Sequence, residues 1–136
     1  MRKIAVLLLS ALSFSACKKE VTEVQQVNQA FSAIYQLNAN GWASTDGNHS
    51  FSTTLPIAEL DDIIQQHGGV IVYLSFDNGT NYEALPEVFN GIAYGATHAT
   101  GAVTIDLFAV DGSTITAPGG TILAKVILID AKALDN

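Results

Sequence analysis

Short strand-like segments separated by turn signals run through this sequence from residue 31 almost to its end. Apolar and polar residues alternate over 31–37, 49–55 and 103–110, whereas 70–76 and 122–129 are apolar at nearly every position. Turns rich in Gly, Asn and Asp recur between these segments, roughly every 8 to 12 residues. The pattern predicts a mainly β fold, an antiparallel β-sandwich of about six to seven strands.

The apolar positions also predict which faces of the strands are buried. The first segment should pack on the core through Phe31, Ala33, Tyr35 and Leu37. The run 70–76 is apolar on both faces, which favours a central strand covered on both sides. Residues 82–85 are expected to form a short partner strand.

Residues 87–100 carry no clear strand or helix pattern. The residues expected to be buried there are Val88, Phe89, Ile92 and Tyr94.

One helix is predicted, over residues 56–67. Pro56 suits a first helical turn, and an apolar stripe follows at helical spacing, formed by Ile57, Leu60, Ile63 and Ile64. Gly68 is expected to end the helix in the left-handed conformation that glycine adopts readily.

Residues 1–16 have the features of a cleaved lipoprotein signal peptide. Arg2 and Lys3 precede an apolar run over 4–12, which is shorter than the roughly 20 residues that cross a bilayer. Phe14-Ser15-Ala16-Cys17 resembles a bacterial lipobox, and Cys17 is the only cysteine of the chain. We therefore expect Cys17 to be lipidated, which anchors the protein to a membrane.

The residues after Cys17 indicate where in the cell envelope the protein is located. Lys18, Lys19 and Glu20 resemble a lysine-plus-acidic tether that directs lipoproteins to the cell surface, and no Asp follows the cysteine directly. The expected organisation is a lipidated cysteine and tether over 17–29 and a single β-sandwich domain over 30–136. The expected location is the outer membrane, at the cell surface or on its periplasmic face.

The charge of the chain excludes one class of partner. Thirteen acidic residues outnumber six Lys plus Arg, so the net charge is -7. Nucleic-acid binding needs a basic face, and we expect none here.

The sequence shows no pattern typical of a catalytic or metal-binding site. His49, His67 and His98 lack the spacing of metal ligands, and the oxygen-rich segments at Asp46 and Asp77 are typical of turns. There is no nucleophile motif. The expectation is a protein without catalytic residues, metal or cofactor.

Three aromatic residues remain as candidates for ligand binding. Trp42, Tyr82 and Tyr94 lie among Asn, Gly and Thr residues, as the aromatics of glycan- or protein-binding loops do. The alternative is that such rings close the ends of a small core, and we favour this for Trp42.

The chain also resembles a family, the small lipoproteins of Bacteroidota in which a Cys-Lys-Lys start leads into a compact β domain. The resemblance rests on Cys17-Lys18-Lys19 and on hydrophobic and turn motifs, namely Leu55-Pro56-Ile57, Ile63-Ile64, Gly68 to Leu74, Leu85-Pro86 and Val126 to Ile129. It implies a β-sandwich lipoprotein and carries no catalytic residues.

Together these features predict a non-enzymatic, lipid-anchored envelope protein with a binding or structural role and a protein or glycan partner. The alternative is a small-ligand carrier, or an accessory subunit of an envelope enzyme or glycan-uptake system. A carrier would need an enclosed apolar cavity.

Overall fold

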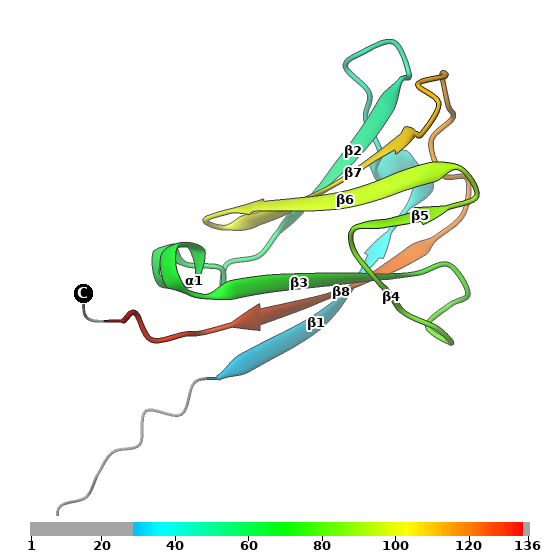
Figure 1. The fold of residues 1–136 in the computed structure, drawn as a ribbon. Helices are drawn as coiled ribbons and strands as arrows, with labels where there is room; N and C mark the ends of the chain where they lie inside the picture. Colours follow the sequence, from blue (N-terminus) through cyan, green and yellow to red (C-terminus); the bar gives the residue numbers. More distant parts are fainter. Residues whose placement is uncertain (1–28, 135–136) are drawn as a thin grey trace, which may run out of the picture.

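The computed structural model describes residues 29–134 as two packed β-sheets with one short α-helix (Figure 1). Each sheet has four antiparallel strands, and the buried side chains form one core cluster. The described chain is therefore mainly β and has the sandwich architecture predicted from the sequence.

Sheet A has the strand order β1-β8-β3-β4. Its members are β1 (Ala30–Leu37), β8 (Ile122–Ile129), β3 (Gly69–Ser75) and β4 (Glu83–Ala84). β8 lies between β1 and β3, with Ala30 and Gly69 both opposite Ile129. The first and last strands are thus neighbours, and the chain enters and leaves the sheet at the same end (Figure 1).

Sheet B has the strand order β2-β7-β6-β5. Its members are β2 (Ser50–Pro56), β7 (Ala102–Ala109), β6 (Ile92–Ala99) and β5 (Glu87–Phe89). A single 3-10 turn, η1 (Ala39–Gly41), follows β1 and leads toward β2. The chain therefore passes from sheet A to sheet B at once, and returns to sheet A through β3.

The core is built from alternate residues of the central strands. Val103, Ile105 and Leu107 of β7 are at most 1% exposed, and every second residue of β8 is buried, from Ile122 to Leu128. This is the alternation of a strand with one face on a core. Each large apolar side chain buried in this way contributes about 1.5–3 kcal/mol to stability.

Residues 29–134 form eight strands where about six to seven were expected. β5 and β6 lie in the stretch 87–100, to which the sequence assigned no element. Tyr94 is buried there and Ile92 is half-buried, but Val88 and Phe89 are 62% and 39% exposed. The expectation that Val88 and Phe89 are buried was therefore wrong. Both belong to β5, which is a short edge strand with Val88 on its outer face.

The helix is shorter than expected. α1 spans only Asp62–His67, and Asp61 is its N-cap, with a carboxylate oxygen that accepts a hydrogen bond from the Ile64 N–H at 2.9 Å. Residues 57–60 instead form a turn that still buries Ile57 and Leu60. Ile63, expected on the buried stripe, is 59% exposed, because it lies about 100° around the helix from Ile64, the residue of α1 that is buried.

Gly68 is not left-handed. Its φ is -86°, so the expected left-handed helix end was wrong. Glycine is required for space instead, because a Cβ at this position would overlap the carbonyl oxygen of Ile129 and lie 2.9 Å from the Ile64 Cα. The helix end is therefore pressed against the last strand.

Candidate functional site

Strand β1 is an edge of sheet A that is paired on one side only. Its eight residues pair with β8, and no other strand within residues 29–134 pairs with its second side. The strand has no proline and no charged residue, which are the residues that proteins use to keep an edge from pairing. Its outer N–H and C=O groups are therefore available to another extended chain.

The other three sheet edges are shorter or partly covered. β4 and β5 have two and three residues. β2 is bridged by Ala43, which lies opposite Ser52, and the strand ends in Pro56. In the part of the chain that the structure describes, β1 is therefore the longest open edge.

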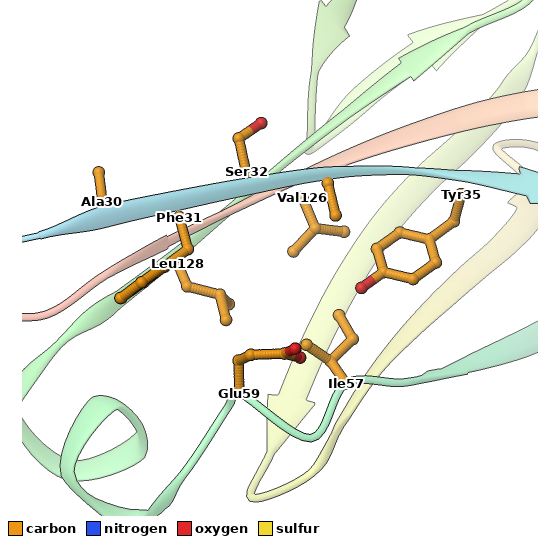
Figure 2. A pocket seen from close by; sticks show the side chains of 9 residues that line it. Ala30, Phe31, Ser32, Tyr35, Ile57, Glu59, Val126 and Leu128 are labelled. Atoms are coloured by element: carbon orange, nitrogen blue, oxygen red, sulfur yellow. The ribbon is translucent and has the colours of Figure 1, made fainter.

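A groove lies beneath β1, on the side of the strand that faces the core. Its volume is about 430 Å³, and its lining is Ala30, Phe31, Ser32, Ala33, Tyr35, Ile57, Glu59, Val126 and Leu128. Figure 2 shows Phe31 and Leu128 together at one end, with Tyr35, Ile57 and Glu59 toward the other. A strand added to β1 would direct every second side chain toward this space, because side chains alternate across a strand.

The groove exists because the first half of β1 has little packed beneath it. Phe31 is 44% exposed and Ala33 is exposed, whereas Leu37 at the other end of the strand is buried. The face predicted for the core was thus right at Leu37 and partly right at Tyr35, which is half-buried. It was wrong at Phe31 and Ala33, whose side chains line the groove.

Tyr35 and Glu59 give the groove a polar end. Burial raises the pKa of the Tyr35 phenol above its ordinary value of 10.0, and the negative charge of Glu59 raises it further. The phenol therefore remains a hydrogen-bond donor at neutral pH. Because Glu59 is the only charged residue among the described residues of the lining, the groove favours a cationic group in whatever occupies it.

The three aromatic candidates lie in three different environments. Trp42 is 7% exposed within the core, and its Nε1 has no hydrogen-bond partner. Tyr94 is 8% exposed, and its ring meets Phe76 edge-on with centroids 5.2 Å apart. Tyr82 is half-buried against Lys125, whose Nζ lies 4.2 Å from its ring centroid. The structure does not bring these rings together into one surface.

The oxygen-rich segments are turns closed by their own carboxylates. Asp46 accepts hydrogen bonds from the hydroxyls of Ser44 and Ser50, which hold its pKa at about 2 together with backbone N–H groups. Asp77 accepts bonds in the same way from the Ser75 hydroxyl and from Asn81. These carboxylates are occupied by turn formation, as the sequence predicted.

The predictions for the N-terminal segment concern residues outside the described part of the chain. These are the signal peptide 1–16, the lipidated Cys17 and the export residues Lys18, Lys19 and Glu20. Within residues 29–134 no helix is long and apolar enough to cross a membrane.

Over residues 29–134, no three His, Cys, Asp or Glu side chains are grouped so that they could hold an ion.

The chain was compared with models of protein families, with curated proteins and with solved structures, and none of the three comparisons finds a match. The candidate site is therefore defined by its own geometry.

The groove was not predicted from the sequence, which indicates only one of the features that form it. The alternation in 31–37 showed which residues share a face, but not that sheet B would leave half of that face open. Glu59 lies within the helix predicted over residues 56–67, whereas in the structure it lies in the turn after β2 and lines the groove.

Proposed function

We propose that this protein is a non-enzymatic, lipid-anchored protein of the bacterial cell envelope that binds an extended segment of a partner protein along β1. The anchor is supported by the lipobox-like Phe14-Ser15-Ala16-Cys17 and by the single cysteine of the chain. The outer membrane is the proposed location, with Lys18, Lys19 and Glu20 as a signal for export to the cell surface.

The observation that carries the binding role is the open edge of β1 above a groove with apolar and polar lining. In strand addition, main-chain hydrogen bonds supply affinity, and pockets for alternate side chains supply specificity. β1 offers both, because its outer edge is unpaired and the groove lies under its inner face.

The chemistry of the groove indicates what the partner segment contains. Phe31, Val126 and Leu128 favour apolar side chains at alternate positions, and Glu59 favours a Lys or Arg at one end. A glycan partner has less support, because Trp42 and Tyr94 are buried and Tyr82 is already stacked against Lys125.

A small-ligand carrier is the second candidate; the size of the groove favours it, whereas the open shape of the groove is not the enclosed apolar cavity of a carrier. A volume of about 430 Å³ lies within the range of about 300–1,000 Å³ that is typical of small-molecule sites. Tyr35 and Glu59 would then orient a ligand that has an apolar body and a cationic or hydroxyl group.

Photo-crosslinking in the native cells tests this proposal. A photoreactive phenylalanine analogue replaces Phe31 in the groove and, as a matched control, Phe108 on the outer face of sheet B. The two side chains are 44% and 49% exposed, so they are equally accessible. We expect a crosslinked protein only at position 31, joined through a segment with alternating apolar residues.

The variant Ala33→Lys provides the second arm, because a lysine in the middle of an edge strand opposes pairing. It should remove the crosslink at position 31 while the melting temperature stays near that of the parent. A small adduct mass at position 31 would favour the carrier. Equal crosslinking at positions 31 and 108, or none at either, would contradict a binding site beneath β1.

A further inference from the structure

The outer face of sheet A, which points away from the core, is apolar and uncovered. β3 and β8 carry apolar residues on both faces, but sheet B covers only the inner one. In register across the sheet, one outward row holds Ser32, Ile127 and Ile71, and the next holds Ile34, Lys125 and Tyr73. An antiparallel sheet commonly exposes a polar face to water, so the apolar side chains on this outer face indicate a contact surface.

The centre of this face holds one lysine between two tyrosine rings. The Nζ of Lys125 is 4.8 Å from the ring centroid of Tyr73 and 4.2 Å from that of Tyr82. The rings keep the ammonium group at the surface while the stem of the lysine lies on apolar neighbours. Lysine and tyrosine beside aliphatic side chains are typical of surfaces at a membrane–water interface.

The acidic character of the protein does not extend over this face. Neither outward row contains a carboxylate, although the chain has a net charge of -7. The acids nearest along the two central strands, Asp77 and Asp130, come after the ends of β3 and β8. Anionic headgroups would therefore meet Lys125 and aliphatic side chains here, whereas elsewhere the acidic domain repels them.

We propose that the outer face of sheet A lies on the lipid bilayer, with Ile34, Ile71 and Ile127 against the interface and Lys125 at the level of the lipid phosphates. This inference rests on the lipid anchor of the proposed function. The chain from Cys17 to Ala30 spans at most about 45 Å when extended, which lets sheet A reach the membrane that holds the anchor. The inner side of β1, with its groove, remains open to a protein partner.

A second copy of the chain fits this face less well. Two such faces packed together would bury the Lys125 of each copy, and neither outward row offers an acid to pair with it. Burying an unpaired charge is costly. At a bilayer the same ammonium group stays hydrated and meets phosphates.

The test uses full-length lipidated protein in vesicles of phosphatidylethanolamine with a minority of phosphatidylglycerol. An environment-sensitive fluorophore is attached to a cysteine introduced as Ile71→Cys or, as the control on the outer face of sheet B, Thr97→Cys. The thiol of Cys17 is consumed by the lipid, so each variant carries one label. We expect a blue shift, and quenching by lipid-borne quenchers, at position 71 and neither at position 97.

Two further variants distinguish contact of the sheet A face with the membrane from attachment through the lipid anchor. Ile34→Asp in the Ile71→Cys protein should abolish the shift without releasing the protein from the vesicles, whereas Val88→Asp on sheet B should leave it unchanged. No shift at position 71, or equal shifts at 71 and 97, would overturn the proposal. A shift that grows with the number of proteins per vesicle would also overturn it and assign the face to a second copy.

The mass of the Cys17 peptide is measured in the same samples. An unmodified Cys17 shows that the anchor has failed, and the experiment is then repeated with Ile71→Cys in a Cys17→Ser background, so that the label at position 71 alone reports on the face. In that case a shift on added vesicles supports the membrane-facing surface, and its absence contradicts it.

Discussion

The ring of Phe76 stacks on the ring of Phe89, with centroids 4.8 Å apart and planes 10° from parallel. Phe76 directly follows β3 of sheet A, whereas Phe89 belongs to β5 of sheet B. The stack therefore joins the two sheets at the edge where β4 and β5 are too short to hold them by pairing.

Removing this stack should loosen that edge. Phe89→Ala should lower the free energy of unfolding by about 1.5–3 kcal/mol, because it loses both the buried area and the aromatic pair. The measurement is urea denaturation. The control is Val88→Ala in the same strand, which should change stability by no more than about 0.5 kcal/mol because Val88 is on the outer face. Equal effects of the two variants would contradict a role for the stack.

Stability should fall as the pH rises from about 5 to 8, because of Glu87. Burial raises the pKa of Glu87 from its ordinary 4.5 to about 7, with further contributions from its hydrogen bond with Glu83 and from the charge of Glu83. The folded protein thus holds this proton more tightly than the unfolded chain does. The resulting stability is present at low pH and is lost as the pH rises through about 7.

Denaturation at a series of pH values checks this expectation. Glu87→Gln should flatten the dependence between pH 5 and 8. The control is Asp46→Asn, which should keep that slope and alter only the acid range, because the pKa of Asp46 is lowered to about 2. A wild-type stability that is constant from pH 5 to 8 would mean that Glu87 is ionised throughout.

Even the smallest substitution of Gly68, to alanine, should destabilise the fold. Gly68→Ala places a methyl group against the carbonyl oxygen of Ile129, and we expect a loss of about 1–3 kcal/mol. Gly95→Ala is the matched control, because a Cβ at Gly95 meets nothing within 4 Å. Thermal melts of both variants give the comparison, and a Gly68→Ala protein as stable as Gly95→Ala would show that the helix end can move away from β8.

Trp42 is the only tryptophan, so its fluorescence reports one buried position. Its emission should be blue-shifted and resist acrylamide, and Trp42→Ala should cost about 3–5 kcal/mol. Trp42→Phe should cost less, because it also removes an indole N–H that has no partner. Red-shifted, easily quenched emission would instead return Trp42 to the candidates for ligand binding.

The lipid anchor is tested by metabolic labelling with palmitate. Cys17→Ser should abolish labelling, since no other cysteine is present. Cells that make the parent protein should lose it to added protease if Lys18, Lys19 and Glu20 direct export. Labelling that persists in the variant contradicts lipidation, and protection of the protein on intact cells would place it on the periplasmic side.

The strands with strong apolar alternation were predictable, and those without it were not. β7 and β8 followed directly from their patterns, because burying one face selects apolar residues at every second position. β6 was missed because Ala, Gly and Thr fill most of its positions, so that only Ile92 and Tyr94 indicate its inner face. Its place is set by pairing with β7 along its whole length, which is a tertiary property.

The predicted helix shows a different limit of prediction from sequence, because apolar spacing alone does not fix where a helix begins. The spacing of Ile57, Leu60 and Ile64 fits a helix, but it also fits a turn followed by a capped helix. Asp61 decides between them, because as an N-cap its side chain satisfies the Ile64 N–H and starts the helix there. The groove could not be predicted from the sequence for a related reason, since it depends on where one sheet ends beneath the other.

The unequal edges of the two sheets have a consequence for assembly. A domain with two long open edges can pair head to tail and grow into a fibre, whereas pairing at a single edge stops after one event. Here β4 and β5 are short and β2 is bridged and ends in proline, so a strand added to β1 leaves no equivalent site for the next. In the proposed complex, the edge arrangement would therefore allow only one partner segment per domain.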